Sequence, residues 1–561
     1  MHEMKKTYNL LAIAAVMALS SGCSDFLELD ESNYHSDEYR FSTFDRTKEM
    51  ATNVYSYIKS GYSDVDSTMH DAATDDAVNA WSTNEIKIFY DGSWNSSNPA
   101  DDMWGHYYEA IAAANYFLEN CPSDFPDAKY QDRYAERLKE LNMYPYEIQA
   151  LRAYFHFELL KRYKTIVIAD RQFSREEVNG LNPVSFDEAV QWISDQCDDA
   201  AKFLPATFQG FTSTGEVARA TKGMALALKA RVLLYAASEL NSPDSRSKWL
   251  KAAKAAKQVI DLNQYQEKVG EKVINNPNSA DLIFGRRDSV SNSFERDNFP
   301  IGYEGGNSGV CPSHNLVEAF DMIDGTPFDW NNPQHRSVAL DPSQRDPRLA
   351  ETVLINGQMF KGMAVESFTG GRNGLPKEGA SPTSYYLRKH LNEGIDLTEG
   401  SSTQAQHIWP IFRYAEILLN YAEALLEATK NPDFTGSADN VTYTLSARQA
   451  LNQIRQRVGM PDITETGYDS FRKRLRNERR VELAFEGHRF WDLRRWKKGA
   501  SSTEITGLEI TPVTYSEETG YIFSYEKKTV QRRIWEDRMN YYPIKDTELF
   551  NNKHLIQNEG W

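Results

Sequence analysis

Residues 476–496 form the most distinctive run of this 561-residue chain, RNERRVELAFEGHRFWDLRRW. Arg474 precedes Glu478 by four residues, and Arg479 precedes Glu482 by three. Both spacings predict ion pairs within one helix. The same run contains four apolar anchors, Phe485, Phe490, Trp491 and Trp496. It also contains Gly487, which permits a sharp helix exit. A basic run with aromatics also occurs in nucleic-acid-binding proteins, but the interleaved glutamates argue against that function. We interpret the run as a packing clamp that contacts no ligand.

Helical periodicity extends over much of the remaining chain. Apolar residues recur every three or four positions, and small residues recur where helices must approach closely, as in Tyr421–Leu425. The predicted helices are Tyr146–Tyr163, Met224–Leu240, Ser247–Ile260, Arg413–Ala428 and Ala447–Val458. Short helices in pairs resemble tetratricopeptide repeats, and a generic helical bundle is the alternative. The sequence therefore predicts a mainly α protein.

Two regions differ from the helical segments in composition and lack their periodicity. Residues 275–406 are rich in Gly, Pro, Asn and Ser, and residues 68–104 combine acidic residues and Asn with three tryptophans. Long irregular segments inside a compact protein usually carry function. We therefore predict an irregular, loop-rich lobe that binds a ligand.

Five further segments, taken together with residues 476–496, resemble the SusD/RagB family. In chain order they are Leu151–Phe155 (LRAYF), Ala319–Gly325 (AFDMIDG), Arg345–Arg348 (RDPR), Tyr414–Ala424 (YAEILLNYAEA) and Tyr541–Ile544 (YYPI). The resemblance keeps this order over nearly the whole mature chain. It implies a SusD-like architecture, in which four tetratricopeptide-like helix pairs carry an irregular ligand-binding lobe.

The same resemblance implies a non-enzymatic receptor that serves as a lid on a SusC-like TonB-dependent outer-membrane barrel. Such pairs import oligosaccharides or, in some branches, peptides. On this interpretation residues 23–240 form an N-terminal region with tetratricopeptide-like helices. Residues 241–561 form the C-terminal SusD/RagB region, which includes the loop-rich lobe at 275–406.

The first residues predict an export signal. Lys5 and Lys6 precede an apolar run, Leu10–Leu19, which is too short to span a bilayer, and small residues then lead to Cys23. This layout resembles a bacterial lipoprotein signal over residues 1–22, with Cys23 as the lipidated residue. An ordinary cleaved signal with an incidental cysteine is the alternative. We therefore predict a lipid-anchored protein of the outer membrane that faces the cell exterior.

Net charge and the absence of certain motifs limit the kinds of ligand and the functions that the sequence predicts. The net charge of −17 repels nucleic acid and anionic membranes but leaves a neutral ligand unaffected. No HExxH, GxSxG or phosphate-loop motif is present, and we predict no cofactor and no metal. Asp321, Asp324 and Gly325 resemble only half of a calcium loop. A surface glycoside hydrolase and a peptide receptor of the same fold remain the alternatives to a glycan receptor.

Candidate ligand contacts follow from the chemistry of sugars. A sugar ring needs an aromatic face for stacking and nearby polar side chains for its hydroxyl groups, because hydroxyls left unpaired on desolvation are costly. Both kinds of residue occur in the two irregular regions. The candidates are Asp76, Asn79, Trp81 and Trp94 in the first region, and Tyr303, Trp330 and Arg372 in the second. For each loop tryptophan, burial in the core is the alternative.

Overall fold

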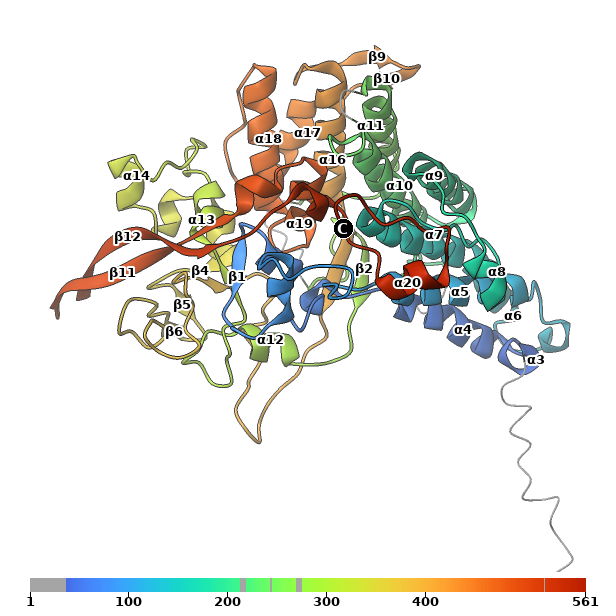
Figure 1. Ribbon diagram of the computed structural model, residues 1–561, viewed down its shortest axis with the longest axis horizontal. Coiled ribbons are helices and arrows are strands. Elements are labelled where there is room, and N and C mark those ends of the chain that lie inside the picture. Colours follow the sequence, from blue (N-terminus) through green and yellow to red (C-terminus); the bar gives the residue numbers. More distant parts are fainter. Residues whose placement is uncertain (1–36, 212–217, 243–244, 269–274, 519) are drawn as a thin grey trace, which may run out of the picture.

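The computed structural model describes residues 37–211, 218–242, 245–268, 275–518 and 520–561, so the predicted signal and Cys23 lie outside the described residues. Helices fill one side of the molecule, and loops with short strands fill the other (Figure 1). The helices of eight or more residues are α4 (Phe44–Ser56), α5 (Trp104–Asn120), α6 (Tyr134–Leu141), α7 (Tyr144–Tyr163), α9 (Phe186–Phe203), α10 (Lys222–Ala237), α11 (Arg246–Ile260), α16 (Tyr414–Thr429), α17 (Ala447–Arg457), α18 (Tyr468–Glu482) and α19 (His488–Arg495). Shorter helices are α3 (Asp37–Arg40), α8 (Arg175–Asn179), α12 (Ser293–Asn298), α13 (His314–Ala319), α14 (Pro333–Ser337), α15 (Pro347–Thr352) and α20 (Asp546–Asn551).

Helices that follow one another in the chain pack together as a stack. α5 packs on α7, α7 on α9, α9 on α10, α10 on α11, and α11 on α16, which in turn packs on α17 and α18. Buried alanines such as Ala230 on α10 and Ala253 on α11 allow close approach of the two helices. The prediction of a mainly α scaffold of packed helix pairs is confirmed. No helix in the described ranges combines the length and apolar character needed to cross a bilayer.

The five predicted helices all occur, with ends shifted by a few residues. Polar side chains set the starts: Thr221 accepts a hydrogen bond from the Met224 amide at the N-terminus of α10, and Ser446 and Gln449 form a capping box at α17. The prediction placed Arg413 inside a helix. Arg413 instead ends strand β8 (Ile408–Arg413) with extended backbone, and α16 begins at Tyr414.

The loop-rich lobe contains short antiparallel strand pairs. They are β1 (Ala77–Asn79) with β3 (Val310–Pro312), β2 (Leu282–Arg287) with β8, β4 (Val353–Leu354) with β7 (Tyr386–Leu387), and β5 (Met359–Phe360) with β6 (Met363–Ala364). A small apolar core of its own includes Phe299, Tyr303, Phe360 and Tyr386. A fifth pair, β9 (Gly436–Ala438) with β10 (Val441–Tyr443), lies between α16 and α17. The lobe is therefore packed, although little of it is regular.

A long β-hairpin extends outward from the lobe (Figure 1). Its strands are β11 (Glu504–Ser516) and β12 (Gly520–Arg532), which pair antiparallel with each other. Sequence analysis did not predict this hairpin. Leu508 and Ile510 near its base are buried, whereas Tyr515 near its tip is 62% exposed.

The run at 476–496 folds as the end of α18, a turn, and α19. Gly487 takes φ +73° at the end of the turn, where a side chain would be strained. The predicted helix exit at Gly487 is wrong, because α18 already ends at Glu482 and Gly487 directly precedes the first residue of α19. The predicted ion pairs within the helix are wrong. Arg474 pairs instead with Asp321, and Arg479 donates to Asp492 at 2.7 Å. Both arginines point away from α18 toward other elements, because the helix is buried on several sides.

Glu482 is the centre of a buried ion-pair cluster. Its carboxylate accepts hydrogen bonds from Arg348 at 2.9 Å, Arg413 at 2.9 Å and Arg457 at 2.6 Å. The neighbouring Glu486 accepts from Arg413 at 2.6 Å. These cations come from α15, β8 and α17, so the cluster joins the lobe to the helical scaffold. Phe485, Phe490, Trp491 and Trp496 are all buried, as expected of a packing clamp.

Candidate functional site

Strand pairing brings the two irregular regions of the sequence together. β1 pairs with β3, with Asn79 opposite Val310, and the Ala80 amide donates to the Gly309 carbonyl at 2.8 Å. Directly beyond this pair, the indole Nε1–H of Trp81 donates to the Asn307 carbonyl oxygen at 2.8 Å. Two loops 226 residues apart in the chain therefore form one surface.

Asn79 fixes the backbone that carries Trp81. Its Oδ1 accepts a hydrogen bond from the Trp81 amide at 2.7 Å, and its Nδ2 donates to the Thr68 hydroxyl at 2.8 Å. Such side-chain-to-backbone bonds stabilise turns. Trp81 is half-buried, and its one polar atom already has a partner. The exposed remainder of this side chain is therefore aromatic.

Tyr303 and Arg372 lie together, but both serve the lobe interior. Tyr303 is only 5% exposed, its hydroxyl donates to the Met363 carbonyl at 3.0 Å, and its ring packs edge-on against Phe360. The Arg372 guanidinium lies 5.7 Å from the Tyr303 ring centroid and donates to the Ala364 carbonyl. The Tyr303 ring therefore offers little surface for stacking on a ligand.

Two of the predicted contacts are core residues. Trp94 is 1% exposed, with its ring 4.9 Å from Phe89 and 5.0 Å from Tyr542, so it presents no face to a ligand. Asp76 is fully buried and accepts a hydrogen bond from Arg480 Nε at 2.6 Å. The predictions that Trp94 and Asp76 contact a ligand are therefore wrong. Trp94 packs in the apolar core, and Asp76 forms a buried ion pair with Arg480.

Trp330 is half-buried at a second position in the lobe. Its ring packs edge-on against His314, with centroids 4.7 Å apart, and His314 Nδ1 lies 2.8 Å from the Tyr385 hydroxyl. Trp330 precedes α14, which Figure 1 shows at the outer edge of the lobe, away from β1. The structure therefore groups Trp81 with Asn79 and Asn307, and it places Trp330 elsewhere in the lobe.

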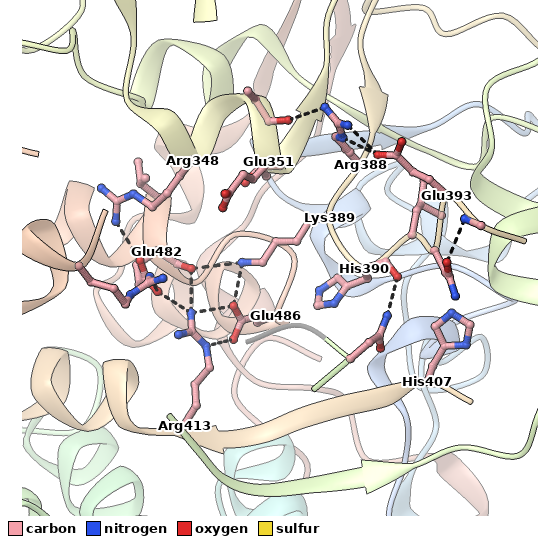
Figure 2. Close-up of a pocket in the computed structure, with 18 of the residues that line it drawn as sticks. Arg348, Glu351, Arg388, Lys389, His390, Glu393, His407, Arg413, Glu482 and Glu486 are labelled. Atoms are coloured by element: carbon pink, nitrogen blue, oxygen red, sulfur yellow. Dashed lines mark hydrogen bonds and ion pairs between the residues drawn. The ribbon is translucent and has the colours of Figure 1, made fainter. Parts of the chain in front are cut away.

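A cavity of about 680 Å³ opens between the lobe and the end of α18 (Figure 2). Its charged lining is largely paired internally: Arg413 with Glu482 and Glu486, Lys389 with Glu486 at 2.8 Å, and Arg388 with Glu393 at 2.7 Å. Dashed lines in Figure 2 mark several of these bonds. The cavity floor is therefore the outer side of the ion-pair cluster, whose charges already have partners.

Two carboxylates in this cavity, Glu482 and Glu486, are held ionised. Burial alone would raise the pKa of Glu486, but Arg413 and Lys389 outweigh burial and lower the pKa to about 2. For Glu482 too, nearby arginines outweigh burial and hold its pKa well below the ordinary value. Glycoside hydrolysis needs one carboxylic acid that stays protonated near neutral pH. Glu482 and Glu486 cannot supply it.

A family model described as SusD family matches residues 271–561, slightly more than half of the chain. The chain belongs to the SusD family. A second model, described as starch-binding and associating with the outer membrane, matches residues 25–234. The resemblance found in the sequence is therefore confirmed. SusD family members are binding proteins without catalytic activity, which agrees with the prediction of a non-enzymatic chain.

Several SusD relatives match the chain over most of its length. SusD-like protein P38 of Formosa agariphila is 23% identical over 538 residues, which cover 90% of this chain and 94% of the relative. A crystal structure of a SusD-like protein from Bacteroides fragilis has a TM-score of 0.73 at 26% identity, covering 94% of this chain and 99% of that one. A solved laminarin-binding SusD-like protein has a TM-score of 0.61 at 20% identity, covering 92% and 99%.

Sequence reasoning missed the partner that orients Trp81. The Asn307 carbonyl oxygen is a backbone atom, and residue type alone does not reveal it. The signal that was available is the Gly-rich turn at 305–309, which brings β3 back alongside β1. Gly309 takes φ +23°, and a Cβ there would lie 2.6 Å from the Asn298 side chain.

Proposed function

We propose that this SusD family member captures oligosaccharides at the outer face of the outer membrane and delivers them to a SusC-like TonB-dependent barrel. In this proposal a lipid on Cys23 holds the protein on the membrane. The observation that carries the proposal is the surface where Trp81 meets Asn307 at 2.8 Å. Family membership supports a binding role, and the descriptions of relatives support a carbohydrate.

The Trp81 surface has the chemistry that a sugar needs. The indole offers an apolar ring whose N–H is already satisfied, and the exposed residue Asn307, whose backbone carbonyl accepts that N–H, adds an amide side chain beside it. A neutral sugar is not repelled by the net charge of −17, whereas a polyanion is. The cavity near Glu482 is less suitable for a charged peptide, because its cations are already paired with carboxylates.

Calorimetry on protein lacking residues 1–23 tests the proposal directly. The ligand panel contains laminarin, soluble starch, other neutral polysaccharides and short peptides. Trp81→Ala is expected to keep the melting temperature of the unaltered protein and to lose roughly 1–3 kcal/mol of binding free energy, the usual effect of truncating a central contact. Trp330→Ala tests the half-buried tryptophan at the second position in the same way. Unchanged affinity in both variants would show that neither tryptophan contacts the ligand.

Two further measurements separate the alternatives. A receptor binds the polymer without shortening it, so reducing ends that accumulate in proportion to protein concentration would support a hydrolase instead. Tight binding of peptides with no binding of glycans would support a peptide receptor. Co-purification of a TonB-dependent barrel with the full-length chain tests the proposed delivery step.

A further inference from the structure

The outer half of the β11–β12 hairpin is an exposed surface that the Trp81 site does not use. The two strands pair with each other, and the hairpin extends outward from the molecule (Figure 1). Tyr515 is 62% exposed, Tyr521 is 49% exposed and Tyr525 is 37% exposed. A two-stranded hairpin is only marginally stable in water, so large exposed side chains on it call for a functional explanation.

Strand register places the aromatic rings on one face. Tyr515 lies opposite Tyr521, and Ile510 lies opposite Tyr525, with Phe523 between the two tyrosines of β12. Ring centroids are 4.8 Å apart for Tyr515 and Tyr521, 5.7 Å for Tyr521 and Phe523, and 6.4 Å for Phe523 and Tyr525. These side chains form a continuous row, which we call the hairpin aromatic row.

The body of the protein holds this row in position. The ring of Phe368, itself 9% exposed, packs against Tyr521 and Phe523 with centroids 5.1 Å apart in each case. At the base, the Thr369 amide donates to the Ile510 carbonyl at 2.8 Å. The rings are therefore fixed before any ligand arrives, which lowers the entropic cost of binding.

Charge indicates the kind of ligand. Residues 510–516 and 520–525 contain no charged side chain, although a quarter of the chain is charged. On the face of the row the hydroxyl groups are those of the tyrosines, whereas Thr511, Thr514, Ser516 and Ser524 lie on the opposite face of the hairpin. Glu517 and Glu518 occupy the tip and disfavour an anionic membrane. Tyrosine rings that carry their own hydroxyl groups, with no charged side chain among residues 510–516 and 520–525, suit a neutral ligand that has apolar faces and many hydroxyl groups.

We propose that the hairpin aromatic row is a second glycan-binding surface, which holds a neutral polysaccharide while the Trp81 surface holds another part of the same chain. This inference rests on the proposed glycan capture. Alternate residues on a strand lie about 7 Å apart, so the row contacts several sugar units rather than one. Two surfaces on one molecule raise retention of a long polymer without a matching gain for a short fragment.

Matched double variants test the row. Tyr515→Ser with Tyr521→Ser removes two exposed rings. Val513→Ser with Ile522→Ser removes two equally exposed aliphatic side chains, 61% and 56% exposed, that are not part of the row. Each is compared with the unaltered protein and with Trp81→Ala, with melting temperature as the check on folding. Native electrophoresis through gels containing laminarin or soluble starch measures retention, and calorimetry measures affinity for a trisaccharide of the same polymer.

The tyrosine variant is expected to bind the polymer at least about tenfold more weakly and to bind the trisaccharide within about twofold of the unaltered protein. The Val513 and Ile522 variant should match the unaltered protein in both assays. Equal polymer retention by the tyrosine variant would overturn this inference alone. Equal loss in the aliphatic variant would also overturn it, since polymer retention would then depend on apolar hairpin side chains in general and not on the aromatic row. An unaltered protein that no polymer retains would overturn the proposed function itself.

Discussion

The guanidinium of Arg489 donates two hydrogen bonds, each 2.8 Å long, to the two carboxylate oxygens of Asp75. Arg489 belongs to α19, and Asp75 lies just before β1, the strand that leads to Trp81. The burial of Asp75 would raise its pKa, but Arg480 and Arg489 outweigh burial and hold the pKa well below the usual range. The packing clamp at 476–496 therefore holds the segment that leads to the candidate site.

Breaking this pair should destabilise the fold and disturb the site together. We expect Arg489→Met to lower the free energy of unfolding by about 3–5 kcal/mol, because the Asp75 carboxylate stays buried without this partner. Urea denaturation measures the change. Lys202→Met, which removes an exposed pair with Asp199, is the matched control and should have little effect. If both variants unfold alike, the buried pair does not stabilise the join between α19 and β1.

Trp94 and Trp81 should respond in opposite ways to truncation. Trp94 packs on Phe89, Tyr542 and Trp561, so we expect Trp94→Ala to lower stability by about 3–5 kcal/mol through a cavity. Below its melting transition this variant should bind glycan with nearly unaltered affinity. Thermal melting and calorimetry on the same samples decide the matter. If the Trp94→Ala protein is folded but no longer binds glycan, Trp94 contributes to ligand binding and its assignment to the core alone is contradicted.

Alkaline pH should weaken the contact between His70 and its two carboxylates. His70 Nδ1 lies 2.7 Å from Asp64, and Nε2 lies 3.1 Å from Asp101, which Arg162 also contacts. Burial would lower the pKa of His70, but Asp64 and Asp101 outweigh burial and raise the pKa to about 9. A pKa above the unfolded value means that protonated His70 stabilises the fold below pH ~6.5 and that this contribution is lost as pH rises through about 9.

Melting temperatures recorded between pH 6 and 9.5 test this dependence. The unaltered protein should lose stability on the order of 3 kcal/mol over that range from His70. His70→Gln should flatten the profile, while His554→Gln, at an exposed position, should not change it. An identical slope in all three proteins would show that His70 is not the titrating group.

Asp71 should cause a second loss of stability as pH rises, in a lower pH range than the loss due to His70. It is buried beside Asp76, and burial followed by the charge of Asp76 raises the pKa of Asp71 to about 7. Neutral Asp71 therefore stabilises the fold at low pH, and the contribution disappears as pH rises through about 7. Asp71→Asn should raise the melting temperature at pH 8 and leave it unaltered at pH 4.5. A lower melting temperature at both pH values would contradict this assignment.

Cys23→Ala tests the proposed membrane anchor. The apolar run Leu10–Leu19 followed by small residues predicts that Cys23 is acylated, so the variant should leave the outer-membrane fraction or remain as an unprocessed precursor. Membrane fractionation and mass spectrometry of the N-terminus measure the outcome. Recovery of the variant as an acylated surface protein would contradict the lipoprotein prediction.

The helical scaffold was predictable because its signals are local. Apolar spacing located α7, α10, α11, α16 and α17 to within a few residues, since each helix buries a face that the sequence marks directly. The partners of Arg474 and Arg479 were not predictable in this way. Helical spacing offered Glu478 and Glu482, whereas the folded protein supplies Asp321 and Asp492. Tertiary contacts replace local ones when a charged helix is buried.

The candidate site was predictable only in part, because loop aromatics carry no local sign of burial. Trp81 and Trp94 occur in similar polar surroundings in the sequence, yet one is half-exposed and the other fully buried. What separates them is Tyr542 and Trp561, more than 440 residues further along the chain. The β11–β12 hairpin was not predictable for a different reason. Most side chains of β12 are exposed or half-buried, so the strand has no buried face that would require a clear alternation of apolar and polar residues.

The three guanidiniums around Glu482 also constrain how this protein can evolve. Loss of that one carboxylate leaves Arg348, Arg413 and Arg457 crowded together in the interior, so each single replacement is unfavourable while the others remain. A substitution at any of these four positions is tolerated only if residues in other, separate segments change at the same time. Lineages that acquire new ligand preferences are therefore expected to do so through the lobe loops and the hairpin, whose side chains can change one at a time.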